Sequence, residues 1–130
     1  MKARFLNVDL DIESASKLDS LAAAMGKRVV VLHSGPAPKA RRHMLTLESS
    51  PEHKGPDATI HALCGVVESL SPAARRVWNA ARKEFNVGCE LRPSERYSCF
   101  SLRPDTLERI AKLGAKLLVT YYRGESDDGS

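Results

Sequence analysis

Three acidic residues occupy every second position near the start of the chain: Asp9, Asp11 and Glu13. They alternate with the apolar residues of "LNVDLDIE", which is the pattern of a β-strand with one buried face and one wet face. Their carboxylates would stand about 6.5 to 7 Å apart along the strand, where they could bind a cation or a basic partner. The alternative is a solvated sheet face balanced by arginines of neighbouring strands. The other side chains that we expect on this open sheet face are Glu84, Glu90, Arg92, Arg103 and Tyr122.

A second kind of chemistry is anion binding by clustered cations. The loop "PKARRH" carries Lys39, Arg41 and Arg42, and a helix further along carries Arg75 and Arg76. Arginines in such clusters can hold phosphates through two parallel hydrogen bonds. Aromatic residues make up only 5% of the chain, and neither cluster has interleaved aromatics on which bases could stack. A phosphate or nucleic-acid binder is therefore the alternative to a flexible, solvated basic loop.

Histidines and cysteines offer nucleophilic or metal chemistry. His61 and Cys64 lie three residues apart on an expected helix, but no second pair at ligand spacing supplies the further ligands that zinc requires. His33 ends a strand and could meet Tyr121 or Tyr122 across the sheet. No nucleophile elbow, phosphate-binding glycine loop or metal motif is present. We therefore predict no catalytic residue, metal or cofactor; an enzyme site assembled in space near His33, Tyr121 and the carboxylates is the alternative.

The elements that must position these residues follow from hydrophobic periodicity. Alternating or β-branched segments predict six strands, and segments with apolar residues at helical spacing predict four helices, in the order β α β β α α β β α β. Trp78 falls on the apolar face of the third helix, where core packing is favoured over an exposed interface role. The strands are expected at residues 6–13, 28–33, 43–49, 84–92, 97–103 and 116–122, and the helices at 16–25, 56–70, 71–81 and 105–113.

Residues 103–124, "RPDTLERIAKLGAKLLVTYYRG", repeat the pattern of residues 14–35, "SASKLDSLAAAMGKRVVVLHSG". Each segment runs from a capping box through an amphipathic helix to a glycine and an apolar strand. Capping rules alone generate much of this match, so duplication and coincidence both stay open. One-sided strands with short helices predict an α+β two-layer sandwich: a mainly antiparallel or mixed sheet of about six strands with helices on one face. The expected capping boxes are Ser16 with Asp19 and Asp105 with Glu108.

Composition sets the class of protein. The 130 residues suffice for one core, and we expect a single α+β domain over residues 1–124 with a disordered acidic tail over residues 125–130. The net charge of +4 permits an anionic partner without requiring one. No apolar run approaches the roughly 20 residues of a membrane span, and the start lacks the apolar stretch of a signal peptide. The three cysteines show no CxxC spacing, which argues against a disulfide framework. We expect a cytoplasmic protein without membrane contact.

Three stretches, "FLNVDLDIES", "ARRVWNAARKEFNVG" and "LRPDTLERIAKLGAKLLVTYY", together resemble small uncharacterised bacterial proteins. These are similar to domain-of-unknown-function families found partly among the immunity proteins of toxin systems. The resemblance implies a bacterial, cytoplasmic setting and carries no site residue onto this chain.

A non-enzymatic interaction module, immunity-type or regulatory, is the function that these patterns favour. It would meet another protein through the open sheet face or an exposed edge strand. Self-association as a homodimer through the same surface is a further expectation, because an exposed edge strand accepts a symmetric partner.

Overall fold

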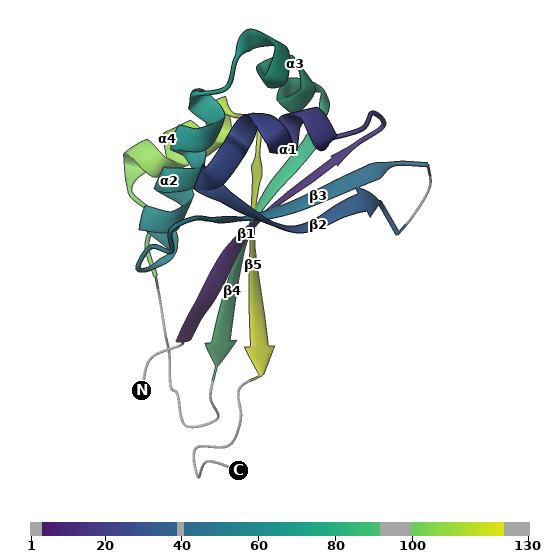
Figure 1. Ribbon diagram of the computed structural model, residues 1–130. Coiled ribbons are helices and arrows are strands. Elements are labelled where there is room, and N and C mark those ends of the chain that lie inside the picture. Colours follow the sequence, from purple (N-terminus) through teal and green to yellow (C-terminus); the bar gives the residue numbers. More distant parts are fainter. Residues whose placement is uncertain (1–3, 39–40, 92–99, 124–130) are drawn as a thin grey trace.

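The protein folds into one open sheet with a layer of helices, as a computed structural model shows (Figure 1). The structure describes residues 4–38, 41–91 and 100–123. The strands are β1 (Arg4–Ser14), β2 (Val29–Pro36), β3 (His43–Ser49), β4 (Arg82–Leu91) and β5 (Lys116–Arg123). The helices are α1 (Asp19–Met25), α2 (Pro56–Glu68), α3 (Pro72–Ala80) and α4 (Pro104–Lys112), with a 3₁₀ turn at Gly26–Arg28.

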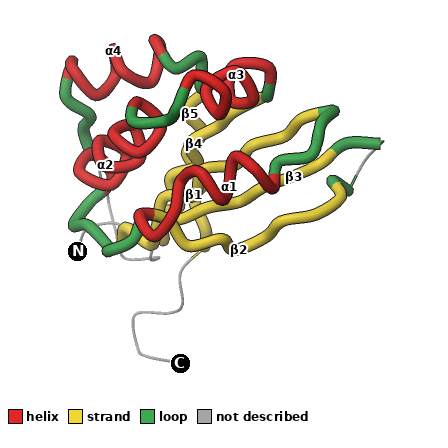
Figure 2. The backbone as a smooth tube through the Cα atoms, turned by 45° about the horizontal axis from the view of Figure 1, so that its top comes forward, coloured by secondary structure: helices red, strands yellow, loops and turns green. Residues whose placement is uncertain are grey.

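The strand order is β2-β3-β1-β4-β5, and every neighbouring pair is antiparallel except β4 and β5, which are parallel. From β1 to β4 the chain follows the interlocked split βαβ path of ferredoxin-like topology, with α2 and α3 in the second crossover. The unit of α4 and β5 then extends the sheet by one parallel strand. Figure 2 shows all four helices on one side of the sheet.

The predicted α+β class, with a mixed sheet and helices on one face, is confirmed. The described residues form five strands, close to the expected number of about six. Of the strand expected at residues 97–103, the described part, residues 100–103, carries no strand, and the rest lies outside the described residues. The expected acidic tail at residues 125–130 also lies outside them.

The strand β1 lies at the centre of the sheet, and its strict alternation turns one face of the strand into the core. Val8, Leu10 and Ile12 are at most 2% exposed and point into the helix layer. Burying one such aliphatic side chain contributes about 1.5 to 3 kcal/mol. The helices add their own apolar stripes to the same core, and Trp78 is fully buried there, as the helical spacing predicted. The largest buried side chains from other elements are Leu21, Leu45, Leu47, Ile60, Leu63, Val67, Phe85 and Val87.

Neither of the two expected capping boxes is formed. The residues that precede α1 and α4 are Leu18 and Arg103, and neither caps its helix with a side chain, so both predicted capping boxes are absent. The start of α4 instead receives a carboxylate from another helix, because the Arg103 backbone N–H donates to Asp57 Oδ1 at 2.8 Å. Ser71 does cap its helix, since its side chain accepts from the Ala74 backbone N–H at the start of α3, at 3.3 Å.

Both predicted stop glycines end their helices. Gly114 has a φ of 70°, a left-handed value that an L-residue with a side chain rarely adopts. Its backbone N–H donates to the Ala111 carbonyl, and the next residue, Ala115, donates to the Ile110 carbonyl. This double hydrogen bond is the Schellman arrangement, and it turns the chain directly into β5.

The two echoing units occupy opposite edges of the sheet. The first, with α1, ends in β2; the second, with α4, ends in β5. The longest described helix, α2, has 13 residues, and no helix among the described residues joins the length and the apolarity needed to cross a bilayer.

Candidate functional site

The predicted carboxylate row lies on the helix-free face of the sheet, which we call the open sheet face. Asp9, Asp11 and Glu13 alternate with the buried residues of β1 and are partly buried themselves. Each has a polar partner on this face. Asn7 Nδ2 donates to Asp9 at 2.9 Å, Thr46 Oγ1 donates to Asp11 at 3.0 Å, and Glu13 accepts from Arg42 Nε at 2.7 Å. The row is therefore held in place by hydrogen bonds within the protein.

Asp9 is the carboxylate whose ionisation is most perturbed. Its pKa is raised from 3.8 to about 6, chiefly because the surrounding sheet removes water from it. The negative charges of Asp11 and Glu48 add to this rise, and the hydrogen bond from Asn7 opposes it. The Asp9 carboxyl on the open sheet face is therefore expected to lose its proton near pH 6.

Of the neighbours expected on this face, three are in place: Glu84, Glu90 and Tyr122. Glu84 lies opposite Asp11 in the pairing of β1 with β4. Tyr122 lies over Gly88, with its ring 3.5 Å from the position that a Cβ on this glycine would take. Glu90 pairs in register with Tyr122, and Arg92 lies outside the described residues.

Arg103 does not join the open sheet face, so its predicted place is wrong. The residue lies at the start of α4, in the helix layer, where its side chain pairs with Asp105 at 3.4 Å and its backbone N–H is bound by Asp57. The reason is that residues 100–103 do not form a strand. Without a strand there is no alternation to turn Arg103 outward.

The basic residues do not form a single patch. Arg42 turns back along the sheet to Glu13, so the loop and the carboxylate row neutralise each other in part. Arg41 is exposed, and Lys39 lies outside the described residues. On α3, Arg75 donates to Asn79 and Arg76 is exposed. The described ends of β2 and β3 next to this loop lie away from α3 in both views (Figures 1 and 2).

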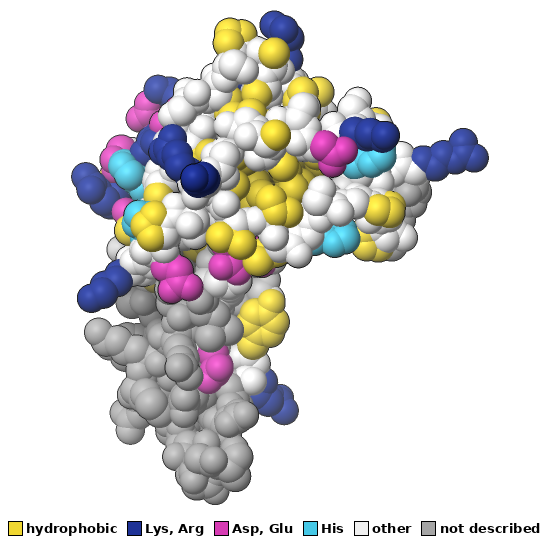
Figure 3. All heavy atoms as spheres, viewed as in Figure 1, with side chains coloured by type: hydrophobic (Ala, Val, Ile, Leu, Met, Phe, Trp, Pro, Cys, Tyr) yellow, Lys and Arg dark blue, Asp and Glu magenta, His cyan; other side chains and the backbone are white. Residues whose placement is uncertain are grey.

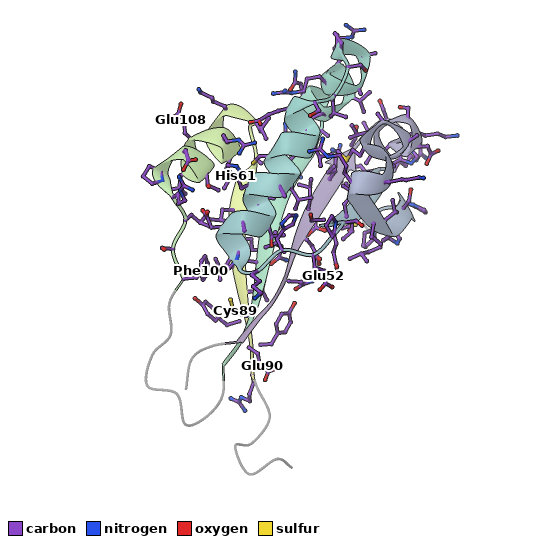
Figure 4. The ribbon with its side chains drawn as sticks, turned by 60° about the vertical axis from the view of Figure 1, so that its left-hand side comes forward. Glu52, His61, Cys89, Glu90, Phe100 and Glu108 are labelled. Atoms are coloured by element: carbon purple, nitrogen blue, oxygen red, sulfur yellow. The ribbon has the colours of Figure 1, made fainter. Side chains whose placement is uncertain are left out.

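His61 takes part in a polar cluster between two helices, on the side of α2 that faces α4 (Figure 4). Arg109 of α4 forms an ion pair with Glu68 and lies 2.8 Å from His61 Nδ1. Burial raises the pKa of Cys64 to about 11, so its thiol stays protonated near neutral pH. No group of three His, Cys, Asp or Glu residues in the described part of the chain could hold a metal ion.

The expected meeting of His33 with the tyrosines is wrong. His33 lies on β2 and pairs with Thr46, whereas Tyr121 and Tyr122 lie on β5, at the other edge of the sheet. The error arises because similar helix and strand units suggest neighbouring positions, although three strands separate them. An enzyme site assembled from these groups has no geometric basis.

Both edge strands expose large apolar side chains, which sequence reasoning missed. Val30, Val31 and Leu32 on β2 are 45 to 49% exposed, and four residues on β5 are 39 to 52% exposed. A run that is apolar at consecutive positions is typical of a strand buried on both faces, so "KLLVTYY" reads as a covered strand. Figure 3 shows hydrophobic surface, next to charged side chains, where β4 and β5 run toward the chain termini. The four residues on β5 are Leu117, Leu118, Tyr121 and Tyr122.

The surface of the described residues includes the following two hollows. One, of about 390 Å³, lies between the start of β1, the end of β3 and the loop before α2, with Glu52 and His53 at its rim. Glu52 projects from that loop in Figure 4. The other, of about 540 Å³, lies at the end of the sheet where β4 and β5 begin. It is lined by Asp11, Ile12, Glu13, Met44, Ala81, Arg82, Lys83, Glu84, Gly114 and Lys116.

Comparison with protein-family models, with curated proteins and with solved structures gives no match for this chain. A fold alone does not define an activity, because one fold carries many functions. The side chains and edges described above are therefore the basis for assigning a function.

Proposed function

We propose that this protein is an interaction module that binds an extended segment of a partner protein along the free edge of β5. The observation that carries the proposal is the exposure of Leu117, Leu118, Tyr121 and Tyr122, at 39 to 52%, on a strand with one hydrogen-bonded neighbour in the described sheet. An edge strand presents unpaired backbone N–H and C=O groups, and a partner strand satisfies them while covering the apolar side chains.

The two edges differ in how open they are to pairing. On β2 the register shifts between Val31 and His33, and the strand ends at Pro36. A bulge and a proline both hinder strand addition. On β5 the register with β4 is continuous over all eight residues, and the strand contains no proline. The edge of β5 is therefore the better template.

The positive charges at the two ends of β5 favour an acidic partner over a second copy of the chain. Lys116 and Arg123, both exposed, stand at the two ends of β5. A second copy paired through its own β5 would bring four cations to one interface, which costs affinity. An extended apolar segment with acidic residues at its ends would pair with them instead. An immunity-type or regulatory role, in which such pairing blocks a target protein, fits this surface.

The test is a selection from a displayed library of random peptides against the full chain. We expect the enriched peptides to alternate apolar residues and to carry acidic ends. Binding of a synthetic peptide of this kind should be lost in the double variant Leu118→Lys and Tyr122→Lys. The matched control, Val30→Lys with Leu32→Lys, places the same charges at equally exposed positions on β2 and should retain binding.

Two results would overturn the proposal. Equal binding by both double variants would show that β5 is not the docking edge. Sedimentation that reveals a dimer of the wild-type chain, dissociated by Leu118→Lys and Tyr122→Lys, would replace the acidic partner with a second copy. Circular dichroism of each variant establishes that the fold is intact.

A further inference from the structure

Lys83 is a lysine placed among apolar side chains. It is the second residue of β4, and its side chain points to the same side of the sheet as the buried Phe85 and Val87. It is only 9% exposed, and its Nζ lies 5.4 Å from the centre of the Trp78 ring. Within the described part of the chain, the side chain of Lys83 makes neither a hydrogen bond nor an ion pair. Its amine has no fixed acceptor.

The nearby end of α4 does not provide that acceptor. Three of the carbonyl groups at this end are bound by other donors: those of Ile110 and Ala111 accept from the turn at Gly114, and that of Leu113 accepts from Trp78 Nε1 at 3.0 Å. A lysine near a helix C-terminus often binds these carbonyls. Here the helix end is capped without Lys83, so a helix-capping role does not explain the lysine.

The surroundings make the amine of Lys83 easier to deprotonate than that of an exposed lysine. The pKa of the amine is lowered, mainly because burial removes water from Lys83. The positive charge of Arg75 on α3 is the second, smaller cause. Desolvation and a neighbouring cation are the two means by which proteins make a lysine nucleophilic. Only the neutral form has the free electron pair that attacks a carbonyl carbon.

The amine also borders an open space. Lys83 lines the hollow of about 540 Å³ at the end of the sheet. Gly114 lines it too, and a Cβ on this glycine would come within 3.4 Å of Lys83 Nζ. The missing side chain leaves room beside the nitrogen. The remaining lining includes Glu84 and Lys116, so charges of both signs surround the hollow.

We propose that Lys83 is a nucleophilic amine that forms an imine with a small, uncharged aldehyde or ketone in this hollow. The Nζ electron pair forms a bond to the carbonyl carbon, the electrons of the C=O π bond move to oxygen, and the oxygen takes up the proton that the nitrogen then loses; the second N–H proton leaves later with the hydroxyl group as water. The resulting carbinolamine loses its oxygen as water while a C=N bond forms. The sum is amine plus carbonyl compound giving imine plus water, and no oxidant or reductant takes part.

The test uses propionaldehyde with sodium cyanoborohydride, which reduces an imine to a stable secondary amine. The full chain is treated briefly near neutral pH, and peptide mass spectrometry measures the adduct on each lysine. We expect several-fold more adduct on Lys83 than on the exposed Lys27 and Lys116. As the pH of the reaction is lowered, adduct formation on Lys83 should decline later than on the exposed lysines, because a smaller fraction of the Lys83 amine is protonated.

Two variants serve as controls. Lys83→Arg keeps a cation over Trp78 and removes the amine, so the fast adduct should vanish. Lys116→Arg removes another lysine of the same hollow and should leave it unchanged. Labelling of Lys83 that is equal to or slower than that of Lys27 would overturn the proposal, and so would a fast adduct that survives in Lys83→Arg. The peptide selection on β5 does not use Lys83, so the two proposals fail separately.

Discussion

The raised pKa of Asp9 predicts that replacing this residue with asparagine stabilises the protein at neutral and higher pH. A group whose pKa is higher in the folded than in the unfolded chain favours folding only while it is protonated. The contribution is fully present below 3.8 and is lost as pH rises through the folded value of about 6. An asparagine side chain is never charged, so the variant Asp9→Asn escapes this loss while keeping an oxygen that accepts from Asn7.

The expected gain in the free energy of unfolding follows from the size of the pKa shift of Asp9. A change from 3.8 to about 6 corresponds at most to about 3 kcal/mol. Asp9 is only partly buried, and water screens its charge, so we expect about 1 kcal/mol in the free energy of unfolding at about pH 8. At about pH 3 the carboxyl is protonated in both states, and the difference between variant and wild type should approach zero.

Urea unfolding followed by circular dichroism, at several pH values between these limits, measures both free energies. Glu52→Gln, in an exposed loop, removes the same charge and controls for the change in net charge. If Asp9→Asn differs from the wild type by the same amount at every pH, then the proton on Asp9 is not linked to folding and the reasoning fails.

Three further outcomes follow from particular contacts. Trp78→Phe removes the donor to the Leu113 carbonyl and should cost about 1 to 3 kcal/mol in urea unfolding; a change near zero would mean that water replaces the indole. Gly114→Ala, at a φ of 70°, should cost about 1 to 2 kcal/mol, and no loss would contradict the strained turn. Cys64 should resist iodoacetamide at about pH 8 until the chain unfolds, because its thiol has a pKa of about 11 and is buried, and fast labelling of the folded chain would refute this.

Much of the fold was predictable because alternation and helical spacing report burial directly. Val8, Leu10 and Ile12 are buried where the pattern of β1 placed them, and Gly114 ends its helix as its residue type suggests. The capping boxes failed for a physical reason. Asp57, far away in sequence, satisfies the start of α4, so Asp105 is not required as a cap.

The position of the candidate site was less predictable. Arg42 and Glu13 looked like members of two separate sites, and only the β2–β3 hairpin brings them into an ion pair. The exposed apolar residues of β5 were not predictable, because their exposure depends on the order of the strands in the sheet. Nothing local in "KLLVTYY" says that β5 lies at an edge, because its apolar residues suit a covered strand equally well. Nothing local marks Lys83 as buried either, because it stands between the charged residues Arg82 and Glu84.

The place of β5 outside the interlocked strands has a consequence for how the chain tolerates shortening. The strands β1 to β4 form a complete four-stranded sheet of their own, and β5 joins it along β4 alone. Removal of α4 and β5 would uncover one side of β4 and with it part of the surface above Phe85 and Val87, which are now fully buried. Helix α4 and strand β5 therefore shield β4 from solvent. The edge that we propose for partner binding is the side of β5 that faces away from β4.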